Sequence, residues 1–231
     1  MNGVNVLGFV LGDARLCVRW IGRILLLIVP FVLLEPHTAS AGLFGPSVPG
    51  QSTMMIEIGH RAAPRAYDKM CKREPILCEM DRHSGAGQLE TMSEVRWQMV
   101  LDLNEELNER IRPRDDLSLF GVSDFWTRGL RYGDCEDYII AKKEALIARG
   151  MAPENLLYGI IQDDWNGGYH AVLILRTTDG DYVLDNLRDR ILPWEKTGYD
   201  FIMRQSGIEA EAWVAIETRG ASPLTSLTQL D

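Results

Sequence analysis

One cysteine, one histidine and one aspartate have the surroundings that nucleophilic thiol chemistry requires. Cys135 lies in the segment Gly-Asp-Cys-Glu-Asp-Tyr, residues 133–138, directly before an apolar segment with helical character. His170 and Asp185 follow downstream, each in a strand-like apolar segment. A thiol attacks only as the thiolate, and a histidine that a carboxylate orients can take its proton. The three residues are therefore candidates for nucleophile, base and orienting group.

The acidic neighbours of the cysteine act against this chemistry. A helix N-terminus lowers the pKa of a thiol, because its unpaired N–H groups and its dipole favour negative charge. Asp134 and Glu136, which flank Cys135, raise it, because they are like charges beside a thiolate. A histidine partner would offset them by forming an ion pair. A cation held by the same two acids would do so as well.

The elements that must position these residues are a helix and a strand hairpin. Residues 134–149 are predicted to be a helix, with Asp134 as a candidate N-cap and Gly150 as a natural C-cap. Residues 156–162, 169–175 and 181–187 are rich in β-branched and aromatic side chains and predict three strands. The last two strands are expected to form a hairpin.

The register of that hairpin decides whether His170 and Asp185 meet. A four-residue loop over residues 176–179 would pair Leu175 with Gly180, and His170 with Asp185, on one face of the sheet. A two-residue turn at residues 179–180 would instead pair His170 with Asp189 and separate the two candidates. We expect the first register, in which Asp185 orients the imidazole.

The remaining segments complete an α+β pattern, in which helices pack on one face of an antiparallel sheet. A long helix over residues 88–112 is expected to end before Pro113, residues 54–58 to form a short edge strand, and residues 212–217 to form a final strand. Residues 67–87 are expected to be a loop with a glycine-rich connector, residues 114–132 a connector, and the chain from Phe201 a short helix or loop. The helical stripe comprises Leu89, Met92, Val95, Met99, Leu103, Leu107 and Ile111, widened by Trp97 and Val100.

The N-terminus has the features of an export signal. Arginines precede a short apolar stretch over residues 24–34, and a small-x-small site (Ala-Ser-Ala) ends at Ala41. The alternative is an uncleaved anchor, although the apolar stretch is short for a span of roughly 20 residues. We expect residues 1–41 to be a signal peptide and residues 42–231 the working domain, periplasmic or secreted and without a membrane span. The net charge of −9 argues against nucleic acid as a partner.

The expected export bears on whether the cysteines form a disulfide. Cys71 and Cys78 are seven residues apart with Pro75 between them, and an oxidising compartment favours a disulfide. Two free buried thiols are the plain alternative. A metal site is the functional alternative, although His83 is the only nearby soft ligand and the spacing matches no zinc pattern. A disulfide would leave Cys135 as an unpaired thiol in the mature chain.

These segments resemble the bacterial transglutaminase-like cysteine proteinases, including their LapG-like periplasmic branch. The resemblance covers most of residues 52–206. It is carried by Trp126, residues 133–138 (GDCEDY), Lys142, residues 168–173 (GYHAVL) and residues 183–186 (VLDN), with support from Asn104, Asn108 and the Cys71–Pro75–Cys78 segment.

The resemblance implies a papain-like or transglutaminase-like fold with Cys135 as nucleophile, His170 as base and Asp185 as orienting residue. In LapG-like members the acids that flank the nucleophile bind calcium, and Asp134 and Glu136 match those positions. The same branch implies proteolysis of a cell-surface or envelope protein, and an inhibitory regulatory protein is a further candidate partner.

Three functions fit these residues. The leading hypothesis is an exported cysteine endopeptidase, in which the backbone N–H of Cys135 stabilises the oxyanion. The second is transglutaminase-type acyl transfer, which uses the same triad with an amine as acceptor. The third is a non-catalytic, calcium-dependent binding module, against which the presence of all three residues argues.

Overall fold

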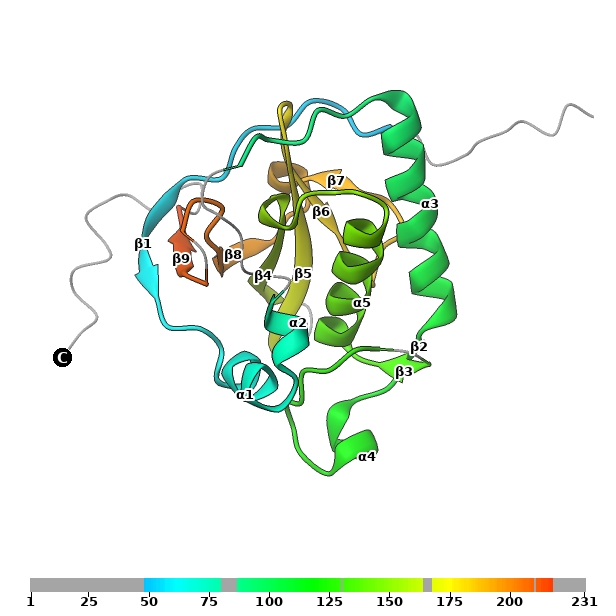
Figure 1. Cartoon of the computed structure of the whole chain (residues 1–231), viewed down its shortest axis with the longest axis vertical. Helices are drawn as coiled ribbons and strands as arrows, with labels where there is room; N and C mark the ends of the chain where they lie inside the picture. Colours follow the sequence, from blue (N-terminus) through cyan, green and yellow to red (C-terminus); the bar gives the residue numbers. More distant parts are fainter. Residues whose placement is uncertain (1–47, 80–86, 130, 164–167, 210, 218–231) are drawn as a thin grey trace, which may run out of the picture. The chain divides into compact units, whose positions relative to one another are not determined.

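A computed structural model describes residues 48–79, 87–129, 131–163, 168–209 and 211–217 of the chain (Figure 1). The expected signal peptide, residues 1–41, lies outside the described residues. Up to the helix that begins at Cys135, the elements are β1 (Glu57–Arg61), α1 (Arg65–Arg73), α2 (Pro75–Glu79), α3 (Glu94–Arg110), β2 (Arg112–Pro113), α4 (Asp116–Phe120), β3 (Tyr132–Gly133) and α5 (Cys135–Ala148). The remaining elements are β4 (Leu156–Asp163), β5 (Gly168–Thr177), β6 (Gly180–Leu184), β7 (Leu192–Pro193), β8 (Asp200–Gln205) and β9 (Trp213–Ile216), with two 3₁₀ turns at Pro153–Asn155 and Trp194–Lys196.

The strands other than β2 and β3 form one antiparallel sheet in the order β1-β9-β8-β4-β5-β6-β7. Strands β4 and β5 are paired along their whole length, from Leu156 opposite Leu175 to Asp163 opposite Gly168. Between Ala171 and Leu175 every residue of β5 is buried, on both faces of the sheet. This uninterrupted apolar stretch therefore forms the centre of the sheet, and its start carries His170.

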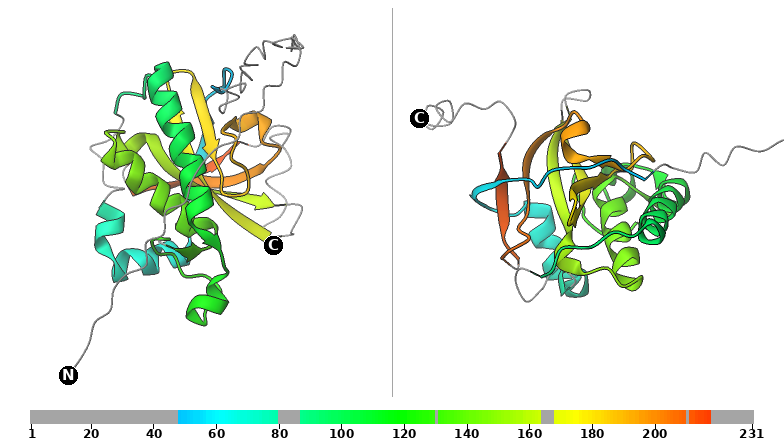
Figure 2. Two further views of the ribbon diagram at one scale, coloured as in Figure 1. Left: turned by 90° about the vertical axis from the view of Figure 1, so that its right-hand side faces the viewer. Right: turned by 90° about the horizontal axis from the view of Figure 1, so that it is seen from above.

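Helices cover one face of this sheet. Helix α5 packs against β5, and α3 packs against α5 (Figure 2). The main hydrophobic core lies between them and includes Leu101, Ile139, Ile140, Leu173 and Leu184. Helices on one face of an antiparallel sheet are the α+β arrangement that the sequence predicts, and the structure confirms it.

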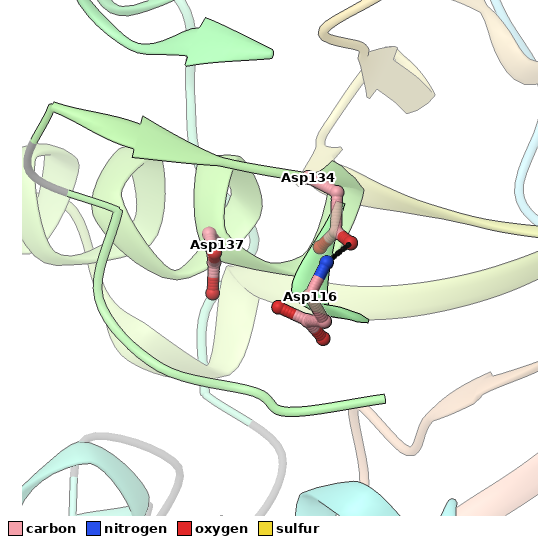
Figure 3. Close-up of side chains that lie close together, drawn as sticks. All are labelled: Asp116, Asp134 and Asp137. Carbon is pink, nitrogen blue, oxygen red and sulfur yellow. Dashed lines mark hydrogen bonds between the residues drawn. The ribbon is translucent and has the colours of Figure 1, made fainter. Parts of the chain in front are cut away.

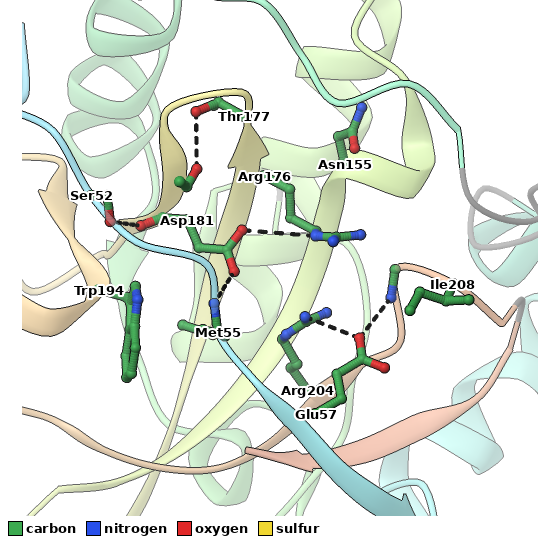
Figure 4. A network of polar contacts seen from close by, with 12 residues as sticks. Ser52, Met55, Glu57, Asn155, Arg176, Thr177, Asp181, Trp194, Arg204 and Ile208 are labelled. Atoms are coloured by element: carbon green, nitrogen blue, oxygen red, sulfur yellow. Dashed lines mark hydrogen bonds and ion pairs between the residues drawn. The ribbon is translucent and has the colours of Figure 1, made fainter. Parts of the chain in front are cut away.

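The opposite face is covered by the segment that precedes β1. Met55 joins Phe201 and Trp194 in a second apolar cluster. The indole N–H of Trp194 donates to the carbonyl of Thr53 at 3.0 Å. The backbone N–H of Met55 donates to a buried carboxylate, that of Asp181, at 2.8 Å (Figure 4). Polar contacts thus hold this segment across the sheet.

Several sequence-based boundaries are wrong for local reasons. Helix α3 begins at Glu94 rather than at residue 88, because the Ser93 side chain accepts the Arg96 N–H at 3.2 Å and caps the helix there. Val95 belongs to the predicted apolar stripe but is 79% exposed. The buried face of α3 is instead Trp97, Val100, Leu101, Leu103, Asn104 and Leu107.

Three other segments also differ from expectation. The segment over residues 67–87 contains helix α2 and most of α1, with Tyr67 and Met70 buried in the core. Residues 200–205 form strand β8 instead of a helix or loop, because Phe201 and Arg204 are buried between neighbouring strands. The edge strand expected over residues 54–58 is β1, displaced toward the C-terminus. The final strand and the start of α5 are where the sequence predicts them.

The β5–β6 hairpin has neither of the two predicted registers. Thr177 pairs with Gly180 and Leu173 with Leu184, so the turn consists of residues 178–179. The predicted register is therefore wrong by two residues. An even displacement keeps every side chain on the same face. His170 and Asp185 accordingly lie on one face as diagonal neighbours just beyond the last paired residues.

The disulfide between Cys71 and Cys78 is present, and Cys135 is the free cysteine among the described residues. The bridge connects α1 to α2, which are separated only by Glu74. Of the helices in the described part of the chain, none has both the length and the apolar character needed to cross a membrane.

Candidate functional site

The cysteine is placed by a short strand that leads directly into α5. Tyr132 and Gly133 pair in parallel with β2, and the carbonyl of Gly133 accepts the N–H of Arg114 at 2.9 Å. A side chain at Gly133 would place its Cβ 2.6 Å from the Cβ of Asp137, so only glycine fits at this position. Cys135 is consequently the first residue of α5, at the helix N-terminus.

Asp134 occupies the N-cap position but does not cap α5 with its side chain. One carboxylate oxygen of Asp134 accepts the backbone N–H of Asp116 at 3.2 Å instead. The prediction of a capping aspartate is wrong in this respect. Asp134 therefore connects the start of α5 to the start of α4, a contact that the local sequence does not predict.

His170 and Asp185 are in direct contact. His170 Nε2 lies 2.8 Å from Asp185 Oδ1, and both side chains are buried. Because β6 ends at Leu184, Asp185 is the first residue after the strand, and its side chain is free to reach across to His170. With Nε2 engaged by the carboxylate, Nδ1 is the ring nitrogen left for proton transfer.

The carboxylate of Asp185 has further partners. The backbone N–H of Leu187 donates to Oδ1 at 3.0 Å, and the hydroxyl of Tyr199 donates to Oδ2. The Tyr199 ring also meets the His170 ring edge to face, with 6.3 Å between centroids. Burial alone raises the pKa of Asp185, but the hydrogen bond and charge of His170 and the other donors outweigh it and hold the pKa below its usual value.

Cys135 and His170 line two adjoining cavities. One has a volume of about 530 Å³, with apolar walls that include Trp126, Ile160 and Met203. The other has a volume of about 440 Å³, and its lining includes Arg114, Asn186 and Leu187. The cysteine and the histidine thus face a cleft that continues on both sides of them.

The thiol is not paired with the histidine in this structure. Cys135 Sγ donates to Oε2 of Glu136 at 3.2 Å. Burial and the negative charge of Glu136 raise the pKa of the Cys135 thiol well above its usual value, while the backbone N–H of Ala171 acts in the opposite direction. The local environment therefore favours the protonated thiol, as the flanking acids in the sequence suggest.

Five acidic side chains gather beside the cysteine. Oxygens of Asp116, Asp134 and Asp137 lie within 4.8 Å of one another, and so do oxygens of Asp116, Asp124 and Glu136. Figure 3 shows Asp116, Asp134 and Asp137 converging from α4, from the residue before α5 and from its first turn. We call these five residues the acidic cluster.

Burial and mutual repulsion raise the pKa values of the acids in the cluster, so their ionisation is disfavoured. Burial, followed by the charge of Asp134, raises the pKa of Glu136 to about 10. Burial also raises the pKa of Asp137 to about 8, although the Thr127 N–H partly lowers it. The pKa values of Asp116, Asp124 and Asp134 are raised as well, in each case mainly by desolvation, although Asp124 itself is exposed. Like charges held together in a buried place need a compensating positive charge.

The acidic cluster fits a hard cation. Oδ1 of Asp116, Oδ1 of Asp134 and Oδ2 of Asp137 are buried and have no hydrogen-bond partner among the described residues. Carboxylate oxygens without donors are the ligands that calcium uses. Of the two predicted ligands, the structure places Asp134 in one group and Glu136 in the other, and Asp116 belongs to both.

Sequence reasoning missed part of this site. Asp116 and Asp124 fall in the segment predicted to be a connector, and Asp137 falls in the predicted helix without a functional assignment. The acidic pair at residues 115–116, directly after a helix that ends near a proline, was the available signal. Tyr199 had no signal in the sequence, because its contact with Asp185 depends on the path of the chain after β7.

Comparison with known proteins adds the family. Residues 57–221 match the family model of the bacterial transglutaminase-like cysteine proteinases, BTLCP. No curated protein matches the chain. Among solved structures, the calcium-bound LapG of Legionella pneumophila is similar at 20% identity, over 71% of this chain and 86% of that one, with a TM-score of 0.45. The EGTA-treated form of that protein is similar at 18% identity, over 68% and 81% of the two chains, with a TM-score of 0.44.

Proposed function

The chain belongs to the bacterial transglutaminase-like cysteine proteinases, and from this premise we propose that it hydrolyses peptide bonds with Cys135, His170 and Asp185. Membership makes it a cysteine peptidase; the assignment of the triad rests on geometry. The observation that carries it is the 2.8 Å contact between His170 Nε2 and Asp185 Oδ1, beside a cleft that the free thiol of Cys135 also lines.

The proposed reaction starts when Nδ1 of His170 takes the thiol proton and Asp185 stabilises the resulting imidazolium. Sγ attacks the carbonyl carbon of the substrate, forming the C–S bond and an oxyanion, which the backbone N–H of Cys135 stabilises. The oxyanion collapses, the C–N bond breaks, and His170 gives its proton to the departing amine. A water, deprotonated by His170, then attacks the thioester, and the carboxylate product and the thiol are released.

The shape of the cleft supports a polypeptide substrate. Because the cavities of about 530 and 440 Å³ lie on two sides of Cys135 and His170, a chain can occupy both while its carbonyl meets the thiol. Trp126, Ile160 and Met203 would contact apolar side chains on one side.

A cation in the acidic cluster would complete this site. The residues that would hold Ca²⁺ are Asp134 and Glu136, together with Asp116, Asp124 and Asp137. Bound Ca²⁺ would supply positive charge that offsets the acids beside Cys135 and would occupy carboxylate oxygens that otherwise lack partners. Calorimetric titration with Ca²⁺ tests this: wild type should bind, and Asp134→Ala and Glu136→Ala should bind more weakly. An absence of heat in wild type would refute the calcium site.

The triad is tested with purified protein in the presence of Ca²⁺. Cys135→Ala should abolish cleavage of a protein that the wild type cleaves; undiminished cleavage would refute the mechanism.

Mass spectrometry of the products separates hydrolysis, which gives chain breaks, from acyl transfer, which gives isopeptide links. Comparing the secreted and envelope proteins of a deletion strain with wild type would identify the substrate, which we propose is a cell-surface or envelope protein.

Export is part of the proposal. We infer that residues 1–41 are removed and that residues 42–231 are the periplasmic or secreted enzyme. N-terminal sequencing of the mature protein should begin at Gly42. Co-purification of the mature enzyme from envelope fractions tests for an inhibitory regulatory protein.

A further inference from the structure

The main-chain carbonyl of Asp185 is held by side chains from two helices. Lys142 Nζ, from α5, lies 2.9 Å from this oxygen, and Asn108 Nδ2, from α3, lies 3.0 Å from it. Both donate hydrogen bonds to it. Because β6 ends at Leu184, Asp185 has left the strand ladder, and these two donors hold its backbone in place of strand pairing.

Helix α3 also holds the chain four residues further on. Asn104 donates to the carbonyl of Asp189 at 2.9 Å, and Asn108 donates to its carboxylate at 3.0 Å. The turn over residues 185–189 is thus fixed at both ends by amide or ammonium donors. One of these donors, Lys142, comes from the helix that begins with Cys135.

Lys142 is buried at a cost in stability. Its exposure is 0%, and none of the ion pairs among the described residues involves it. The groups that face it are the Tyr138 ring, 6.0 Å away, and the charges of Asp185 and Asp189. Burial lowers the pKa of Lys142 to about 7, against the opposing influence of those two aspartates. A methionine of similar length would fill the same space without the desolvation cost of an amine.

We propose that Lys142 is a positioning residue of the peptidase site: it ties the backbone of Asp185 to the helix that carries Cys135. The inference rests on the proposed triad. Helix α5 carries Cys135 at its first position and Lys142 two turns later, so the helix sets the distance between the nucleophile and the turn that orients His170. Without Lys142 the main-chain carbonyl of Asp185 would be held by Asn108 alone, and the carboxylate of Asp185 would move relative to the imidazole.

The neighbouring lysine is a matched control. Lys143 is 1% exposed, and its Nζ lies 3.3 Å from Oε1 of Gln205 and 4.6 Å from the centre of the Tyr158 ring. Replacing Lys143 by methionine changes the same chemistry at the same depth in the same helix. These contacts of Lys143 are with residues of β8 and β4 rather than with the turn that begins at Asp185.

The reactivity of the thiol provides a readout that needs no peptide substrate. The rate at which iodoacetamide alkylates Cys135 is measured by mass spectrometry of the peptide that contains Cys135. The measurement is made from pH 5 to 9 in the presence of Ca²⁺ for wild type, Lys142→Met, Lys143→Met and Asn108→Ala. A thiolate–imidazolium pair keeps the thiol reactive below neutral pH. We expect Lys142→Met to slow alkylation at pH 6 by roughly 10- to 100-fold, the range that a displacement of about 1 Å produces.

Stability separates positioning from a structural role. The melting temperature of Lys142→Met should equal or exceed that of wild type. In Lys143→Met, Cys135 should be alkylated at the wild-type rate. Asn108→Ala is the second variant, should Lys142→Met fold poorly, and it should also slow alkylation at pH 6. The two effects should combine less than multiplicatively, since both donors act on one carbonyl.

Two results overturn the inference: wild-type alkylation at pH 6 in Lys142→Met and Asn108→Ala, or equal slowing in Lys143→Met. Asp185→Asn and His170→Ala distinguish this failure from failure of the triad. If these two variants are slow and Lys142→Met is not, only the positioning role is refuted. If they also react like wild type, the triad is refuted and the positioning role with it.

Discussion

Two groups of buried charge in this protein are built in opposite ways. In the network shown in Figure 4, each acid has a basic partner: Arg204 lies 3.0 Å from Glu57, and Arg176 lies 3.7 Å from Asp181. In the acidic cluster of Figure 3, carboxylates face other carboxylates. Both groups are mostly buried, so the difference lies in charge balance rather than in exposure.

The balanced network serves the fold. It connects the segment before β1 to strands β6 and β8, since Asp181 accepts the Met55 N–H at 2.8 Å and Ser52 donates to the Asp181 carbonyl at 2.6 Å. The acidic cluster lies beside Cys135 and lacks a counter-charge among the ion pairs of the described residues. The difference indicates that acids balanced by basic side chains stabilise the fold, whereas the unbalanced acids beside Cys135 support the proposed calcium site.

The largest expected effect comes from breaking the balanced network. Asp181→Ala would leave Arg176 without its acid and would remove one of the two acids near the buried Arg204, which keeps Glu57. Removing one partner of a buried ion pair costs about 3–5 kcal/mol. Urea unfolding should show this loss. Calcium affinity should stay at the wild-type value, because the acidic cluster is unchanged. A loss below about 1 kcal/mol would mean that the network contributes no more than an exposed ion pair.

The next effect comes from the unbalanced group. Asp116→Asn removes a carboxylate common to both groups of candidate ligands. Calcium affinity should fall by roughly 100-fold, because losing a ligand costs at least as much as losing an outer-shell partner. Calorimetry measures this change, and the calcium-free variant should be no less stable than wild type, since a like charge has been removed. Unchanged affinity would exclude Asp116 as a ligand.

A smaller effect is expected at Asp185, the acid of the proposed triad, because its carboxylate has several hydrogen-bond partners. Tyr199→Phe removes one donor from Asp185 Oδ2. Alkylation of Cys135 at pH 6 and kcat should fall by roughly 3- to 10-fold, which corresponds to one hydrogen bond of about 0.5–1.5 kcal/mol. Tyr182→Phe is the matched control, because its hydroxyl donates to Gly50 at 3.1 Å and has no part in the triad. Equal effects in both variants would argue against a role for Tyr199 in the site.

The smallest effect concerns pH and distinguishes Asp185 from the acids of the cluster. Burial tends to raise the pKa of Asp185, but its hydrogen bonds, above all that from His170, lower it below the usual 3.8. Its contribution to stability is therefore present above about pH 4 and is lost as the pH falls through the lower folded-state value. Melting temperatures between pH 2 and 5 should show the difference between wild type and Asp185→Asn shrinking toward the acid end. A constant difference would mean that the carboxylate is not stabilised in its charged form.

Local patterns accounted for much of the fold. The apolar stretches of β4, β5, β6 and β9 were recognisable, because strands buried in a sheet need β-branched and aromatic side chains throughout. The start of α5 was recognisable from Gly133 and the acids that follow it. The α1–α2 segment and β8 were missed, because their conformations depend on burial against distant parts of the chain, as Tyr67 and Phe201 illustrate.

By itself the sequence determined which residue types could do chemistry: a free thiol at a helix start, a histidine at the mouth of a core strand, an aspartate near the next strand, and two flanking acids. It also favoured the Cys71–Cys78 disulfide, since the two cysteines are seven positions apart in a chain expected to be exported, and the structure confirms that pairing. The tertiary structure decided how these residues meet. The hairpin register differed by two residues, yet His170 still reaches Asp185, because an even displacement preserves the face. Only the fold could bring Asp116 and Asp124 to Asp134 and Glu136, or Lys142 and Asn108 to the Asp185 carbonyl, because such contacts depend on how separate elements pack and not on any local preference of the chain.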